Sequence, residues 1–204
     1  MDITEKILSY LKKTYHPLAV IVSGSYADGS FDEGSDFDCT VVVEGEKPFG
    51  HDSNVIDGVP LDCFIYTDEE IEEIDPDAVL PIFNGRIIFD TDGIAANMKA
   101  KVAKYVADNT VTSESDKQVI RGFIVKCMKR MDKNDDDGNY RLISLLWESL
   151  CDYFLLRDMY FFGGKKAIKY LKENDPEGYG LYHKAITEKT PEAVKSWAEY
   201  ILKV

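Results

Sequence analysis

The sequence lacks the long apolar runs and the clustered basic residues that would point to a membrane or to a nucleic acid. Its longest apolar stretches are far shorter than the roughly 20 residues that cross a bilayer, and its first residues predict an acidic helix and no signal peptide. Lys and Arg number 24 against 37 Asp and Glu, which gives a net charge of −13 at pH 7. We therefore expect a soluble, cytoplasmic protein with no membrane partner and no DNA or RNA partner, because neutralising phosphates requires Lys and Arg.

Cysteine and histidine are also scarce. The four cysteines stand in separate apolar stretches without any Cys-x-x-Cys pair: Cys39, Cys63, Cys127 and Cys151. Buried free thiols are therefore favoured over disulfides or a zinc site. The three histidines are isolated in the sequence, so we expect none of them to bind a metal or to act in catalysis.

The chain changes character near residue 110. Before it, apolar runs typical of strands alternate with helical periodicity, and from residue 113 onward only helical periodicity is evident. We predict strands at 19–23, 36–43, 59–66 and 86–89, a polar loop over 44–57, and helices at 3–14, 67–74, 94–108, 114–131, 138–160, 164–173, 177–187 and 191–203. The fold class is therefore α+β, with a small mixed sheet flanked by helices over 1–109 and an all-helical bundle over 113–204.

The most informative segment joins the first two predicted strands. An apolar run leads into Gly24 and Ser25, and a loop of small residues that ends in Ser35 leads into Asp36 and Asp38, which open the next apolar run. Acids at i and i+2 point to the same face of a strand, and two like charges that close are costly unless a cation lies between them. A Gly-Ser corner offers N–H groups and a hydroxyl to phosphate oxygens. The segment therefore predicts a metal beside a phosphate, which is the layout that a nucleoside triphosphate requires.

A third acid strengthens this prediction. An acid-x-acid pair alone means little, because a chain with 37 acids in 204 residues contains about seven such pairs by chance. Asp62, however, stands inside the apolar run 59–66, where a lone carboxylate is costly to bury without a neighbouring cation. If this run pairs beside 36–43, Asp62 reaches the face that holds Asp36 and Asp38. The simpler interpretation makes Asp36 and Asp38 solvated turn acids and Asp62 a surface acid on an edge strand.

Taken together, the pattern resembles the nucleotidyltransferases of the DNA polymerase beta superfamily. The likeness rests on an apolar run ending in Gly-Ser, a loop of about nine residues, Asp-x-Asp and a later Asp in a strand, and it covers roughly residues 18–66. It is greatest for the small-molecule branch, which includes the kanamycin and lincosamide nucleotidyltransferases. The resemblance implies a catalytic nucleotidyltransferase domain over 1–109 and a helical acceptor-binding domain over 113–204.

The resemblance also implies roles for individual residues. Asp36, Asp38 and Asp62 would be catalytic and would bind two Mg²⁺ ions, since oxygen-only ligands favour Mg²⁺ or Mn²⁺ over zinc. The residues implied to bind the triphosphate are Gly24, Ser25 and Ser35.

A carboxylate of the helical domain deprotonates the acceptor hydroxyl in related enzymes, and Glu148 is the candidate for this catalytic base. It lies on a predicted helix rich in apolar residues. Asp152 lies one turn further along the same face, so either acid could serve. An equally simple interpretation is that both are surface acids.

We therefore expect a Mg²⁺-dependent nucleotidyltransferase that transfers a nucleoside monophosphate, with AMP from ATP favoured, to a hydroxyl of a small molecule and releases pyrophosphate. An aminoglycoside-like antibiotic is one candidate acceptor, because an acidic surface suits a cation. Two alternatives are a protein adenylyltransferase of the antitoxin type and a catalytically inactive nucleotide-binding module of the same fold. A homodimer is one possible assembly.

Overall fold

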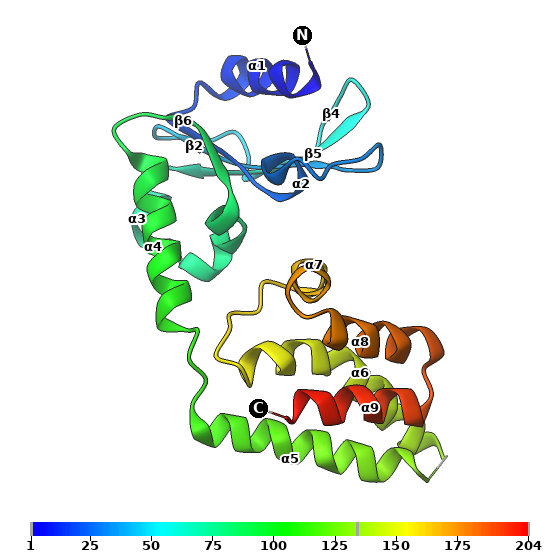
Figure 1. The fold of residues 1–204 in the computed structure, drawn as a ribbon. Coiled ribbons are helices and arrows are strands. Elements are labelled where there is room, and N and C mark those ends of the chain that lie inside the picture. The colour runs from blue at the N-terminus through cyan, green and yellow to red at the C-terminus, as the bar shows by residue number, and fades with distance from the viewer. Residues whose placement is uncertain (1, 134, 204) are drawn as a thin grey trace. The chain divides into compact units, whose positions relative to one another are not determined.

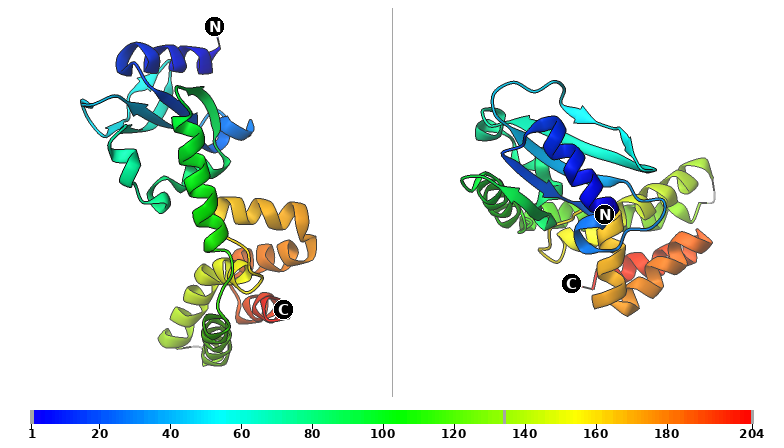
Figure 2. Two further views of the ribbon diagram at one scale, coloured as in Figure 1. Left: turned by 90° about the vertical axis from the view of Figure 1, so that its left-hand side faces the viewer. Right: turned by 90° about the horizontal axis from the view of Figure 1, so that it is seen from above.

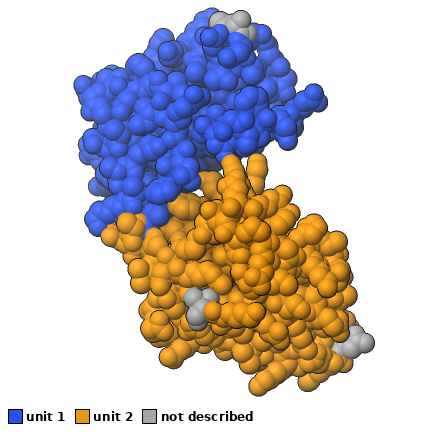
Figure 3. All heavy atoms as spheres, viewed as in Figure 1, with its two compact units in different colours: residues 1–106 blue, residues 107–204 orange. Residues whose placement is uncertain are grey.

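The computed structural model describes residues 2–133 and 135–203. It divides into two compact units, unit 1 (residues 1–106) and unit 2 (residues 107–204), which Figure 3 colours separately. Each unit has its own hydrophobic core. Sheet and helices occupy unit 1 and helices alone follow, so the predicted α+β class is confirmed. Within the described ranges, no helix combines the length and the apolar character needed to span a membrane.

Unit 1 is built on one mixed sheet (Figure 1). Its strands are β1 (Ala19–Val22), β2 (Phe37–Val43), β3 (His51–Asp52), β4 (Val55–Ile56), β5 (Val59–Thr67) and β6 (Arg86–Asp90). The order is β3-β5-β2-β1-β6, and β4 also pairs with β5. The pair β2–β5 is parallel, whereas the other pairs are antiparallel. The strands β3 and β4 lie inside the segment predicted as a polar loop, because two residues each are too few to show an alternating pattern.

The two faces of this sheet have different chemistry. The helical segments of this part of the chain are α1 (Ile3–Tyr15), α2 (Gly24–Asp28), α3 (Glu70–Glu73), the 3₁₀ segment η1 (Pro76–Asn84) and α4 (Ile94–Asp108). Helix α1 lies across one face (Figures 1 and 2), where its fully buried Ile7 and Leu11 pack with odd-numbered strand residues such as Val41 and Ile65. Because side chains alternate along a strand, the even-numbered residues of β2 and β5 project from the opposite face.

Unit 2 consists of helices α5 (Glu114–Met131), α6 (Asp136–Leu155), α7 (Gly164–Asn174), α8 (Pro176–Glu188) and α9 (Pro191–Ile201). The five predicted helices are present, but α6 ends at Leu155 and not at residue 160. The reason lies in Asp158, whose φ of 53° is incompatible with a right-handed helix. Its carboxylate instead accepts hydrogen bonds from the Thr112 N–H at 2.9 Å and the Lys117 ammonium at 2.7 Å.

Two sets of polar contacts, one buried and one partly buried, connect the helices of unit 2. The fully buried indole N–H of Trp197 donates to the Ser149 hydroxyl at 2.9 Å. Asp175 caps α8 by accepting the Gly178 N–H at 2.9 Å, and it also accepts the hydroxyls of Tyr153 and Tyr200 at 2.7 Å each. One carboxylate therefore links α6, α8 and α9.

Replacing Asp175 with Ala should lower the free energy of unfolding by about 2–4 kcal/mol, since it removes a helix cap and leaves two tyrosine hydroxyls without their acceptor. Urea denaturation at pH 7 measures the change. Glu173→Ala is the matched control, because Glu173 is exposed on the preceding turn and its loss should cost less than about 0.5 kcal/mol. Equal effects of the two variants would contradict the assigned role of Asp175.

The same contact should give unfolding a pH dependence. Burial raises the pKa of Asp175, but hydrogen bonds from Tyr200, Gly178 and Tyr153 outweigh it, so the net shift is downward from 3.8. A lowered pKa in the folded state stabilises the fold above the unfolded pKa, and this stabilisation is lost as the pH falls through the folded value. The difference in stability between wild type and Asp175→Ala should therefore shrink below about pH 4.

Candidate active site

Three carboxylates meet on the face of the sheet opposite α1. Asp38 of β2 and Asp62 of β5 are direct partners in the parallel register, and Asp36 precedes β2 by one residue. Each offers one oxygen, and these oxygens lie within 4.8 Å of one another. Asp36 is exposed and the other two are partly exposed, so a solvated ion can reach all three.

The backbone at Gly24 is shaped around Asp38. Gly24 has a φ of 60°, and a Cβ at this position would lie 1.9 Å from Oδ2 of Asp38. The amide of the preceding Ser23 donates to the Asp38 carbonyl at 2.9 Å, which holds the end of β1 beside β2. Only glycine therefore allows both the left-handed backbone and the close approach of the carboxylate.

The two serines predicted to bind phosphate have different surroundings. Ser25 is buried in the first turn of α2. The Ser35 hydroxyl donates to Oδ1 of Asp32 at 3.1 Å and accepts the Asp32 N–H at 2.9 Å. Ser35 thereby closes the loop that leads into β2.

A third serine, which the sequence analysis did not single out, lines a cavity together with two of the acids. The hydroxyl of Ser23 is buried and has no hydrogen-bond partner among the described residues. With Asp38, Asp62 and residues of η1 it lines a cavity of about 180 Å³. The sequence gives no signal for this role: an N-cap serine normally uses its hydroxyl to cap the helix, and only the structure shows that Ser23 makes no such bond.

One histidine, His51, lies beside the three acids. Nε2 of His51 lies 2.7 Å from Oδ1 of Asp62. The contact arises because β3 pairs antiparallel with β5 and places His51 opposite Phe64. A strand of two residues has no recognisable sequence pattern, so the sequence could not predict that His51 lies beside Asp62.

The donor set fits a divalent cation of the Mg²⁺ type. Three carboxylates supply oxygen ligands, which Mg²⁺ and Mn²⁺ prefer. The missing Cβ of Gly24 leaves Asp38 room to approach, and the nearby Ser23 hydroxyl offers a phosphate a hydrogen bond.

Beneath these acids lie two thiols. Cys39 and Cys63 are partners in the same parallel register and are buried on the α1 side of the sheet. A hydrogen bond with Cys63 and burial together raise the pKa of the Cys39 thiol well above its usual range. Both residues therefore act as small core residues, and all four cysteines are free, as predicted.

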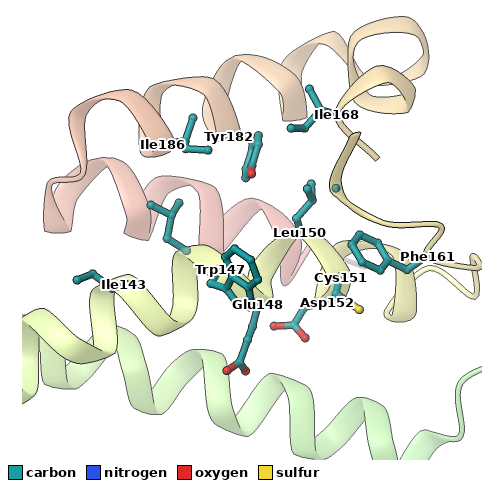
Figure 4. A pocket seen from close by; sticks show the side chains of 12 residues that line it. Ile143, Trp147, Glu148, Leu150, Cys151, Asp152, Phe161, Ile168, Tyr182 and Ile186 are labelled. Carbon is teal, nitrogen blue, oxygen red and sulfur yellow. The ribbon is translucent and has the colours of Figure 1, made fainter. Parts of the chain in front are cut away.

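Glu148, the predicted base, belongs to unit 2. It is exposed on α6 and lines a cavity of about 620 Å³ that side chains of α6, α7 and α8 surround (Figure 4). Asp152 lines the same cavity but is 8% exposed, and its Oδ2 has no hydrogen-bond partner among the described residues. Burial, and then the charge of Glu148, raise the pKa of Asp152 to about 7. The two acids that the sequence could not tell apart thus have different environments.

Comparison with known proteins gives the family. The family model for a nucleotidyltransferase domain matches residues 4–111. A toxin–antitoxin structure with AMP-PNP is similar at 14% identity and a TM-score of 0.34, covering 57% of this chain and 93% of that chain. A nucleotidyltransferase-like protein from Exiguobacterium sibiricum is similar at 14% identity and a TM-score of 0.38, covering 98% and 73%. No curated protein matches the chain.

The region that matches the family model spans more than half of the chain and contains Gly24 and all three converging carboxylates. The protein therefore belongs to the nucleotidyltransferase domain family and is a nucleotidyltransferase.

Proposed function

We propose that the protein transfers a nucleoside monophosphate, with ATP as the favoured donor, to a hydroxyl of a small molecule and releases pyrophosphate. The observation that carries this proposal is the convergence of three carboxylate oxygens within 4.8 Å of one another beside Gly24. Membership of the family supplies the reaction class. The kanamycin- and lincosamide-like branch is our preferred placement within it.

Asp36, Asp38 and Asp62 would hold the divalent cations in this proposal. When bound, two Mg²⁺ ions would neutralise charge on the phosphate oxygens and activate the attacking hydroxyl. His51 positions the third carboxylate through its 2.7 Å contact with Asp62.

We assign the triphosphate to the corner between β1 and β2. Gly24, Ser25 and Ser35 are the binding residues that the sequence pattern implies. To these we add Ser23, whose buried and unpartnered hydroxyl can donate a hydrogen bond to a phosphate oxygen.

The proposed step is a direct displacement at the α-phosphorus. A bond forms between the acceptor oxygen and this phosphorus, and the bond from the phosphorus to the bridging oxygen of the β-phosphate breaks. Pyrophosphate leaves with the electron pair, and Glu148 takes up the proton of the acceptor hydroxyl. No covalent intermediate with the protein is involved.

The cavity in unit 2 favours a small acceptor over a protein acceptor. Its volume of about 620 Å³ lies within the range of about 300–1,000 Å³ that is usual for small-molecule sites. We therefore propose acceptor binding as the role of the helical unit and catalysis as the role of unit 1.

A screen for pyrophosphate release tests the proposed function. The protein is incubated with Mg²⁺, each of the four nucleoside triphosphates and a panel of hydroxyl-bearing acceptors. We expect release that depends on both the acceptor and the metal, and a fall of about 10²–10³-fold in Asp38→Asn, the usual scale for losing one electrostatic contact to the transition state.

Glu33→Gln is the matched control for this screen. Glu33 is exposed in the loop before β2, so the variant removes one charge near the site without touching the three carboxylates. Its activity should equal that of wild type. If Asp38→Asn remains as active as Glu33→Gln, the proposed role of the three carboxylates is wrong.

Two glycine variants, compared with each other, distinguish the effect of backbone strain from the effect of a Cβ that contacts Asp38. Gly24→Ala and Gly29→Ala both force alanine into a positive φ, at 60° and 78° respectively, and each should lose about 1–2 kcal/mol of stability. Only at Gly24 does the new Cβ meet the Asp38 carboxylate, whereas nothing lies within 4 Å at Gly29. Gly24→Ala should therefore weaken Mn²⁺ binding by about tenfold or more, while Gly29→Ala leaves it unchanged.

Electron paramagnetic resonance of Mn²⁺ measures this difference, with thermal unfolding as the check on folding. Equal Mn²⁺ affinity in the two variants would mean that the close approach of Asp38 to Gly24 has no part in metal binding.

A further inference from the structure

The cavity of unit 2 is apolar on most of its surface. Aliphatic and aromatic side chains from α6, α7, α8 and the segment before α7 line it, among them Ile143, Leu146, Trp147, Phe161, Ile168 and Ile186. Trp147 is 85% exposed, which is unusual for so large an apolar side chain. In Figure 4, Tyr182, Ile168 and Ile186 face α6 across the cavity, so an apolar body can be enclosed from both sides.

The charged groups of this lining are all negative. Glu148 and Asp152 lie one turn apart on α6, and Figure 4 shows both carboxylates on the side of α6 toward α5, opposite to Tyr182 and Ile186. No Lys, Arg or His stands among the described residues that line the cavity. The cavity therefore combines apolar walls with an uncompensated acidic edge.

Asp152 is the part of this edge that requires a partner. It is more than nine-tenths buried, and its Oδ2 accepts no hydrogen bond from the described residues. An ionised carboxylate removed from water is costly unless a cation or hydrogen-bond donor compensates it. A donor group carried on an apolar body would supply what the surrounding helices do not.

We propose that this cavity binds an amphiphilic amine, with the apolar body between α6 and α8 and the protonated nitrogen paired with Asp152 and Glu148. Binding of such an amine does not depend on the proposed function. Its role as the acceptor of the nucleotide does. The acceptor would then be a molecule with one cationic nitrogen and a sizeable apolar part. A polyhydroxylated polyamine would make few apolar contacts with the walls of the cavity.

Isothermal titration calorimetry of the full chain, without nucleotide, tests the proposal with two probes of one shape. Phenylbutylamine carries the cation and phenylbutanol is its neutral counterpart. At pH 8 the amine should bind about tenfold or more tightly than the alcohol, the difference expected from a charge-assisted hydrogen bond.

Variants locate the effect. Asp152→Asn should lower the preference for the amine to what Glu148 alone supports and keep the affinity for the alcohol, which also shows that the cavity is still folded. Glu199→Gln is the control, because it removes one exposed charge from α9 without altering the lining. It should retain the full preference.

The pH dependence adds a second readout. Burial and the charge of Glu148 raise the pKa of Asp152 to about 7, so the ionised form that pairs with an ammonium is lost below pH 7. The other titratable or charged groups in its neighbourhood are the Cys151 thiol on α6 and the Tyr182 phenol on α8, together with the Cys127 thiol on α5 and the two cations that act on that thiol, Arg141 of α6 and Lys126 of α5. The affinity for the amine should fall by up to about tenfold per pH unit below 7, while that for the alcohol stays constant.

Three results would overturn the proposal. These are equal affinities for amine and alcohol in wild type, an amine preference that is as large in Asp152→Asn as in wild type, and a dimer that buries Trp147 so that neither probe binds. Failure of nucleotide transfer is a separate matter, because the titration needs no turnover. Amine binding without pyrophosphate release would contradict the proposed function and not this inference. Pyrophosphate release without a preference for the amine would contradict this inference and not the proposed function.

Discussion

The geometry of the candidate site depends on the close approach of one carboxylate to one glycine. Oδ2 of Asp38 occupies the place where any other residue at position 24 would carry its Cβ. The parallel pairing of β2 with β5 then sets Asp62 beside Asp38, and the two-residue spacing adds Asp36 on the same face. The backbone at Gly24, the pairing of β2 with β5 and the two-residue spacing of Asp36 and Asp38 together bring three negative charges close to one another.

Much of this arrangement could be predicted, because its causes are local or follow from alternation. The strands, the helices of unit 2 and the shared face of Asp36 and Asp38 all follow from periodicity. The position of Asp62 required only that two predicted strands be neighbours. By contrast, His51 comes to Asp62 through a two-residue strand, and Ser23 matters because its hydroxyl does not cap α2. Such features depend on tertiary contacts that no short window of sequence contains.

The carboxylates of the two units differ in solvent exposure and in pKa because their surroundings differ. The three carboxylates of unit 1 stand on a partly solvated face of the sheet, where a hydrated metal ion can reach them. In unit 2, burial keeps Asp152 from water, and its pKa rises to about 7, while Glu148 one turn earlier remains exposed. Sequence spacing could place the last two on one face but could not say which would lose its solvent, since that depends on the helices packed around α6.

The alternation along β2 and β5 has a consequence for how this protein can change. Odd-numbered residues such as Cys39 and Cys63 form the core under α1. Asp38 and Asp62, each one position away, lie on the opposite face in the candidate active site. Substitutions of Asp38 or Asp62 therefore change side chains that do not belong to the core under α1. The carboxylates can therefore be exchanged without removing a side chain from the core under α1.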